Sequence, residues 1–338
     1  MKKVIYIVKS ELHIYPPCIA QIRMLKKNGV DVEVWYGSCA KQLLVIFDAE
    51  GIPYVDLHEQ RGKLPGKLDR LNNWHQFASA VKKKMKTVKN VSQMLFWFGT
   101  AETAMPMVGK LKGYNYALTS LELLDDNKTK NRLFSMLTGD AKFIVCCETT
   151  RAFIMRNWYG LKKLPYVMPN KPYDFHDERR KKPSIEATNT GYYFVLMGLD
   201  PENIFADIKK EYDKSIFIKN IPAPYHLEVT SYATIGFVFY DDRNSLNRAF
   251  CAPNKIYEYS GLRIPAIGNE VPGLVNTIGA AKAGICVPMK KDALMRALRD
   301  IEEHYDLYAK NAYDFYQGTD NEALMKRIIK ENGILLDM

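Results

Sequence analysis

Short apolar runs alternate with amphipathic stretches of helical period through the first half of the sequence, and this alternation limits the fold more than any other feature. The runs are too short for helices and are rich in β-branched and aromatic residues. They cover residues 4–8, 30–35, 52–57, 94–98, 116–121 and 143–147. Helices are expected between them, at 17–28, 41–49, 67–89 and 101–111. Strands separated by helices predict a parallel, doubly wound α/β sheet.

The length of 338 residues exceeds what one core usually supports, so two domains are expected. A polar stretch with almost no apolar periodicity, 171–190, is the expected linker. The first domain is therefore placed at 1–170 and the second at 191–338. In the second domain, strands are expected at 193–197, 235–240, 264–268 and 284–287.

Basic residues are concentrated in the first domain. The chain carries a net charge of +10, yet residues 1–170 hold 26 Lys and Arg against 14 Asp and Glu, while the remainder holds 22 against 24. Such asymmetry predicts a polyanionic partner for the first domain: nucleic acid, an anionic membrane face or a phosphorylated substrate. The densest cations lie on the expected helix 67–89, which can rest on anionic lipid or pack on the core with a solvated lysine face.

Several classes of protein are disfavoured by what the sequence lacks. No apolar run reaches the ~18 residues of a membrane span, and Val4–Val8 is too short for a signal peptide, so a cytoplasmic location is expected. The six cysteines show no Cys-x-x-Cys spacing, which predicts reduced thiols and no zinc. Gly-x-Gly-x-x-Gly, Walker and Gly-x-Ser-x-Gly motifs are missing, and no cofactor is expected.

Chemistry is easiest to place between residues 240 and 272. The strand 235–240 is apolar, and ligands in open α/β sheets bind at the carboxyl end of such strands. Pro253 is expected to open a short helix and Gly261 to close it in a left-handed conformation.

Asn254, Lys255 and Glu258 can project from one side of this helix. A cation and free amides at a helix N-terminus favour phosphate, and a carboxylate one turn later can accept both hydroxyls of a ribose. The simpler interpretation is a surface ion pair between Lys255 and Glu258.

The segment Pro-Asn-Lys-Ile-Tyr-Glu-Tyr-Ser-Gly-Leu-Arg-Ile-Pro-Ala-Ile at 253–267, followed by Val-Pro-Gly-Leu, resembles the donor site of GT-B glycosyltransferases of the family-4 type. The resemblance implies two Rossmann-like domains facing a cleft, with C-terminal helices that cross back to the first. It also implies a nucleotide-sugar donor, retention of anomeric configuration, and Glu258 on the ribose. Adjacent acids such as Asp241-Asp242 lack the Asp-x-Asp spacing of metal-dependent glycosyltransferases, so no metal is expected.

The expected donor site is completed by Gly198, Tyr240 and Arg248. Gly198, at a strand end, permits close approach of backbone to phosphate. Many family members have an Arg and a Lys-Gly shortly afterwards, where this chain has Asp200-Pro201-Glu202, and the segment to Ile218 is short by about one strand and one helix. Two alternatives follow. Either a cation from the opposite loop (Lys255, Arg248 or Arg243) replaces the missing charge, or donor binding is altered.

On the first domain, Leu121-Glu122-Leu-Leu-Asp125-Asp126 resembles the family's His-Glu-Leu-Tyr-type segment, with Ser120 where a histidine is common. Glu122 is therefore a candidate contact for sugar hydroxyls, and the two aspartates are expected to cap a helix from Lys128. His13, in the loop after the first strand, is the candidate base of an inverting reaction, or else a capping or surface residue.

Together these features predict a glycosyltransferase that moves a sugar from a nucleotide diphosphate to a glycan or lipid-linked acceptor in bacterial polysaccharide synthesis. The acceptor is expected at the inner membrane face, which the basic first domain would contact. A nucleotide-sugar 2-epimerase is the alternative enzyme. A basic nucleic-acid-binding protein is the non-enzymatic alternative, and it is disfavoured because the basic residues are not interleaved with aromatics on a known module.

Overall fold

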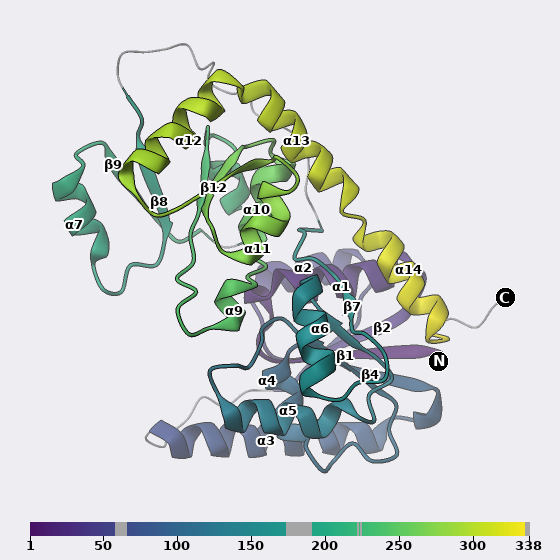
Figure 1. Ribbon diagram of the computed structural model, residues 1–338. Coiled ribbons are helices and arrows are strands. Elements are labelled where there is room, and N and C mark those ends of the chain that lie inside the picture. Colours follow the sequence, from purple (N-terminus) through teal and green to yellow (C-terminus); the bar gives the residue numbers. More distant parts are fainter. Residues whose placement is uncertain (58–65, 174–190, 222, 224, 335–338) are drawn as a thin grey trace.

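The chain forms two lobes in the computed structural model, which describes residues 1–57, 66–173, 191–221, 223 and 225–334 (Figure 1). The side chains of residues 66–68 and 70 lie outside the described part. Most of the expected linker, 174–190, also lies outside it. No helix in the described part of the chain is long and apolar enough to cross a membrane.

The first lobe is built on one parallel sheet of seven strands, in the order β3-β2-β1-β4-β5-β6-β7. The strands are β1 (Lys3–Glu11), β2 (Asp31–Ser38), β3 (Tyr54–Asp56), β4 (Met94–Phe98), β5 (Tyr116–Ser120), β6 (Ile144–Cys146) and β7 (Tyr166–Val167). Successive residues of β1 enter different cores: Val4 and Tyr6 face one cluster, and Ile5 faces the other. The doubly wound sheet predicted from the sequence is confirmed, because both faces of its central strand are buried.

Helices cover both faces of this sheet. They are α1 (Pro16–Lys27), α2 (Lys41–Ala49), α3 (Gly66–Thr87), α4 (Ala101–Ala104), α5 (Lys128–Thr138) and α6 (Thr149–Trp158). α1 and α2 pack on one face, and α3 to α6 pack on the other. The expected helix 101–111 is wrong: α4 stops at Ala104 and a 3-10 turn follows, because Pro106 lacks the N–H that would continue the helix.

The second lobe is smaller and its strands form two sheets. β8 (Phe194–Gly198) pairs with β9 (Ser215–Lys219), and the other sheet has the order β10 (Gly236–Val238), β11 (Ala266–Asn269), β12 (Gly284–Val287). The rings of Phe194 and Phe237 lie 6.1 Å apart and bring β8 beside β10. The helices are α7 (Ile204–Glu211), α8 (His226–Thr230), α9 (Leu246–Ala249), α10 (Asn254–Gly261), α11 (Pro272–Leu274), α12 (Lys291–Glu303), α13 (Tyr305–Gly318) and α14 (Asn321–Glu331).

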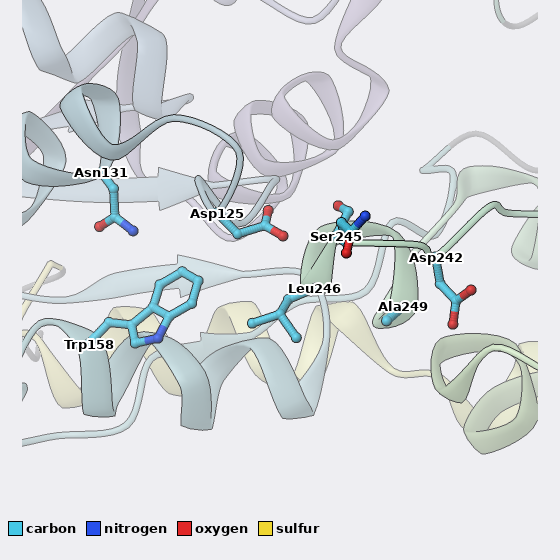
Figure 2. Close-up of a pocket in the computed structure, with 8 residues that line it drawn as sticks. Asp125, Asn131, Trp158, Asp242, Ser245, Leu246 and Ala249 are labelled. Atoms are coloured by element: carbon cyan, nitrogen blue, oxygen red, sulfur yellow. The ribbon is translucent and has the colours of Figure 1, made fainter.

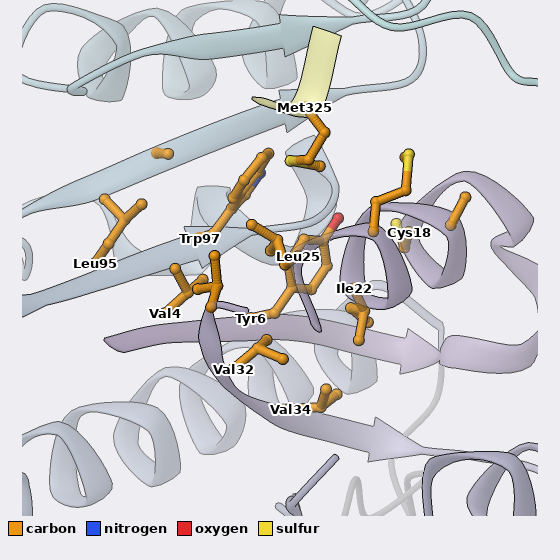
Figure 3. Close-up of a cluster of buried hydrophobic side chains, with 14 of the residues drawn as sticks. Val4, Tyr6, Cys18, Ile22, Leu25, Val32, Val34, Leu95, Trp97 and Met325 are labelled. Carbon is orange, nitrogen blue, oxygen red and sulfur yellow. The ribbon is translucent and has the colours of Figure 1, made fainter. Parts of the chain in front are cut away.

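The last helix returns to the first lobe. α13 runs along the second lobe and α14 continues onto the first (Figure 1). Met325 of α14 is buried in the cluster that holds Tyr6, Leu25 and Trp97, and Figure 3 shows its side chain near the indole of Trp97. At the start of α14 the Asn321 amide donates to the Pro169 carbonyl oxygen at 2.8 Å. Chain segments far apart in sequence therefore close one core.

Candidate functional site

The carboxyl ends of β10 and β11 are fixed to each other by one side chain. Asn269, the last residue of β11, donates through Nδ2 to the Tyr240 carbonyl oxygen at 2.6 Å, and its Oδ1 accepts from the Tyr240 N–H at 2.9 Å. Burial raises the pKa of the Tyr240 phenol. The two bonds hold the start of the loop 241–253 at the sheet edge where ligands of α/β proteins bind.

Two arginines lie in this loop and differ in their surroundings. The Arg243 guanidinium donates to both carboxylate oxygens of Asp241, each at 2.8 Å, and these bonds lower the pKa of Asp241 to about 2. Arg248 is exposed, and its Nη1 lies 3.4 Å from the Asp241 carbonyl oxygen. Within the described residues Arg248 has no carboxylate hydrogen-bonded to it, so it is the freer of the two cations.

The helix α10 presents Lys255 and Glu258 differently. Lys255 is exposed and makes no ion pair with any described residue, whereas Glu258 is buried and its Oε1 lies 3.1 Å from Nε2 of His226 in α8. The surface ion pair between Lys255 and Glu258 that was the simpler expectation does not form. Asn254 is half-buried in the first turn. A donor-site role for these three residues stays a prediction.

The ends of α10 differ from the expectation. The helix begins at Asn254, and Pro253 is the N-cap residue rather than the first helical residue. Gly261 is still helical, and Arg263 takes the left-handed conformation, with φ of 55°. Backbone bonds from Leu262 and Arg263 to earlier carbonyls hold the chain in this turn, so glycine is not required for it.

Gly198 ends β8, and Asp200, two residues later, caps the N-terminus of α7. Both carboxylate oxygens of Asp200 accept backbone N–H groups at the start of α7, from Ile204 at 2.8 Å and Phe205 at 3.0 Å. The N-terminus of α7 therefore already holds an anion. A phosphate would have to compete with that carboxylate, and this is the physical consequence of the unusual sequence after Gly198.

The first-lobe candidates stand apart from α10. Nδ1 of His13 accepts the N–H of Ala40 at 3.2 Å, which leaves Nε2 as the ring nitrogen that can carry a proton. Glu122 is exposed, and its carbonyl oxygen accepts from the Ser120 hydroxyl at 2.8 Å. Neither residue contacts α10 through any bond between described residues. Their predicted roles stay predictions.

The lobes are joined by a buried arginine that the sequence did not single out. Arg151 of α6 donates to the carbonyl oxygens of Phe250 (2.6 Å), Asn247 (2.7 Å) and Leu121 (2.7 Å). Asn247 and Phe250 belong to the end of α9, where unpaired carbonyls favour a cation. Asn247 also accepts from the Leu123 N–H at 2.9 Å. This set of bonds fixes α9 to the first lobe.

Beside this contact lies an interlobe pocket of about 490 Å³ (Figure 2). Its lining comes from both lobes: Asp125, Asn131, Trp158, Asp242, Asn244, Ser245, Leu246 and Ala249. The expectation that Asp125 caps α5 is wrong. Asn127 is the cap and accepts the Lys130 N–H at 2.9 Å, while Asp125 reaches across and accepts the Asn247 N–H at 3.2 Å.

No family model matches the sequence, and no curated protein matches it either. The structure, in contrast, resembles solved structures over nearly its whole length. Sucrose-phosphate synthase from Thermosynechococcus elongatus matches with a TM-score of 0.68 and 14% identity, covering 97% of this chain and 98% of that one. Anabaena HepE in complex with UDP-glucose matches with 0.67 and 12%, covering 98% and 100%. A UDP-N-acetylglucosamine 2-epimerase matches with 0.62 and 13%, covering 99% and 98%.

Because these matches cover nearly the whole of this chain, they extend over both lobes and the helix α14. At such identities they establish the fold, and the residues that act within it must be argued from this chain alone. The protein has the GT-B fold.

Proposed function

We propose that the protein is a metal-independent, retaining glycosyltransferase that moves a sugar from a nucleotide diphosphate to a glycan or lipid-linked acceptor in bacterial polysaccharide synthesis. In this reaction the bond from the sugar C1 to the diphosphate oxygen breaks, and a bond from C1 to an acceptor oxygen forms. The acceptor's hydroxyl proton leaves with the diphosphate. The GT-B fold and the UDP-glucose complex of one structural neighbour support a nucleotide-sugar donor.

The observation that carries this proposal is the buried carboxylate of Glu258. His226 holds its Oε1, and no described residue hydrogen-bonds its Oε2. A carboxylate fixed at one oxygen is positioned to accept ribose hydroxyls at the other, with little loss of side-chain freedom on binding. The contact with His226 also partly satisfies the desolvated charge when the site is empty.

The leaving diphosphate would be stabilised by cations of the opposite loop. Lys255 and Arg248 are exposed at the carboxyl edge of the second-lobe strands and have no carboxylate partner in the described chain. The capped N-terminus of α7 makes this source of charge necessary, because Asp200 already occupies those N–H groups. We therefore assign diphosphate binding to Lys255 and Arg248, with Asn254 beside them.

A thermal-shift screen against UDP, GDP, dTDP and CMP tests the proposal. A nucleotide at a hundred times its dissociation constant should add about 2.7 kcal/mol of stability. The base that stabilises the protein also identifies the donor class. The transferase proposal fails if none of the four nucleotides raises the melting temperature.

A nucleotide-sugar 2-epimerase is the second candidate, favoured by the structural similarity to such an enzyme. Epimerisation needs groups that take and return a proton next to the sugar, and Glu122 is an exposed carboxylate after β5 that could do so. One measurement distinguishes the two reactions. A transferase releases nucleoside diphosphate only when an acceptor is added, whereas an epimerase changes the donor sugar without any acceptor.

We also propose that the first lobe contacts anionic membrane through α3. Lys82, Lys83 and Lys86 are exposed in its last turns and Lys89 is exposed just beyond its end, while Val81 and Met85 anchor the helix in the core. Each surface cation near an anionic leaflet contributes about 1 kcal/mol. Co-sedimentation with phosphatidylglycerol vesicles should fall when the four lysines are changed to glutamine. Equal binding to purely zwitterionic vesicles would contradict the electrostatic origin.

A further inference from the structure

We propose that the interlobe pocket beside Arg151 is a binding site for a neutral saccharide, separate from the predicted donor site. The pocket borders α5 and α6 of the first lobe and α9 of the second (Figure 2). None of the residues predicted to bind the nucleotide lines it. Its volume of about 490 Å³ lies within the range of small-molecule sites in proteins.

The polar side chains of the lining suit a neutral sugar. Asp125, Asp242, Asn131 and Ser245 supply carboxylate, amide and hydroxyl groups, and the lining contains no lysine or arginine. Carboxylates and amide oxygens accept the hydroxyl protons of a sugar, and amide N–H groups donate to its oxygens. A phosphate or a nucleotide diphosphate would meet two carboxylates with no cation among the lining residues. The pocket therefore suits an uncharged polyol and disfavours the donor.

Asp125 has an acceptor atom without a partner. Its Oδ2 accepts the Asn247 N–H, while its Oδ1 is buried and has no hydrogen bond. A buried carboxylate oxygen is costly when unpaired, so a hydroxyl donor that reaches it is favoured. Because Asp125 belongs to the pocket lining, a small rotation of its side chain would bring Oδ1 to a ligand hydroxyl.

The indole of Trp158 gives the pocket an aromatic wall. This side chain is 37% exposed although Trp35 and Trp97 are fully buried, and Figure 2 shows its ring beside the gap, next to Leu246. A half-exposed aromatic face beside hydrogen-bonding groups matches a sugar ring, which has an apolar face of C–H groups and a rim of hydroxyls. Leu246, 41% exposed, extends the apolar wall.

This site deepens the proposed function by assigning a neutral glycan as the acceptor class, and in that respect it depends on the proposed function. Saccharide binding itself needs no donor, so it is measured separately. Intrinsic tryptophan fluorescence of the intact protein is titrated with maltotriose, lactose, chitotriose and mannobiose at millimolar concentrations. We expect at least one of these saccharides to quench or shift the emission of Trp158, which Trp158→Phe abolishes.

Variants then locate the binding by calorimetry with the saccharide that responds. Trp158→Ala should weaken it about tenfold, and Asp125→Asn should weaken it a few-fold while keeping the acceptor for Asn247. Phe153→Ala is the matched control, because Phe153 is 54% exposed on the same helix and does not line the pocket. Circular dichroism checks that each variant is folded.

The outcomes separate the two proposals. Saccharide binding that responds to Trp158→Ala but not to Phe153→Ala supports the site. The site is overturned if no saccharide of the four binds, or if Trp158→Ala and Asp125→Asn leave the affinity unchanged. UDP binding is measured in parallel: a protein that binds saccharide but no nucleotide keeps this site and loses the transferase, and the reverse result loses only this site.

Discussion

Both lobes are built on parallel sheets with helices, but the sheet of the first lobe is larger and more completely covered. The first lobe has seven hydrogen-bonded strands and helices on both faces of its sheet. The second lobe has sheets of three and two strands, and the two-stranded sheet exposes large apolar side chains: Val195 is 48% exposed, Ile216 44% and Phe217 37%. A two-stranded unit is marginal by itself and depends on what packs against it.

Few elements surround the two-stranded sheet of the second lobe. Between β8 and β10 the described chain holds only α7, β9 and α8. In the two-stranded sheet β9 pairs with β8 alone, and α7 packs against β9 through Phe205 and Phe217, whose rings lie 5.2 Å apart. The first lobe is therefore a rigid platform, whereas the outer half of the second is held by few contacts and should respond most to ligand.

The largest expected effect is in native-state hydrogen exchange. Amides of β1 and β4 should exchange only through global unfolding, while those of β8 and β9 should exchange through local opening at a cost lower by several kcal/mol. Mass spectrometry of peptic fragments measures both sets. Equal protection of the two sets would show that the two lobes do not differ in local stability. Slower exchange in β8 and β9 on adding UDP would show that the ligand orders the weaker lobe.

The next effect concerns the arginine that joins the lobes. Arg151→Met removes hydrogen bonds from three carbonyl oxygens and should destabilise the protein by about 3 kcal/mol, as measured by urea unfolding. Arg156→Met, an exposed arginine on the same helix, should change stability by less than about 0.5 kcal/mol. A similar loss for both variants would show that Arg151 does not carry the contact between lobes.

A smaller effect is expected at the predicted ribose site. Glu258→Ala should weaken nucleotide binding about tenfold to a hundredfold, and His226→Leu should weaken it less, since His226 only fixes the carboxylate. Glu303→Gln on the exposed face of α12 is the control. Calorimetry with the stabilising nucleotide gives the affinities. Unchanged binding in Glu258→Ala would remove Glu258 from the site and leave the fold unaffected.

The smallest effect is expected at the cap of α7. Asp200→Ala leaves two backbone N–H groups of the helix without a partner and should cost about 1 kcal/mol. Hydrogen exchange of the α7 amides should become faster, while that of the α1 amides stays unchanged. If phosphate restores the lost stability, the bare helix N-terminus can bind anions and Asp200 is what excludes them.

Local patterns predicted the elements well wherever the signal is contained in one segment. The helix expected at 41–49 and the strands expected at 94–98 and 284–287 have the same bounds in the structure. Apolar period and helix-stop residues are properties of a few neighbouring positions, so one sequence is enough to predict them. The prediction of one helix over 101–111 was wrong although Pro106, which indicates an early helix end, is visible in the sequence. The helical periodicity of the segment was given more weight than this proline.

Contacts between distant residues could not be predicted in the same way. Nothing near Glu258 indicates that His226 is its partner, and nothing in α6 indicates that Arg151 binds carbonyls of α9, about a hundred residues later. Asn247 and Asn269 each hold a distant segment through a single side-chain amide, and one residue of this kind produces no pattern in the sequence. The one local indication is that Arg151 lies among apolar residues such as Ala152, Met155 and Cys147, because a buried guanidinium needs hydrogen-bond acceptors.

The hydrogen bond between Asn321 and Pro169 has a consequence for how this protein is put together. The chain leaves the first lobe near Pro169 and returns to it near Asn321, so the second lobe is inserted between two neighbouring points of the first lobe. The helix α14, which completes the first lobe, follows the second lobe in the sequence. Because Met325 of α14 is part of the first core, we expect folding of that core to depend on a second lobe that holds the two ends of the insertion together.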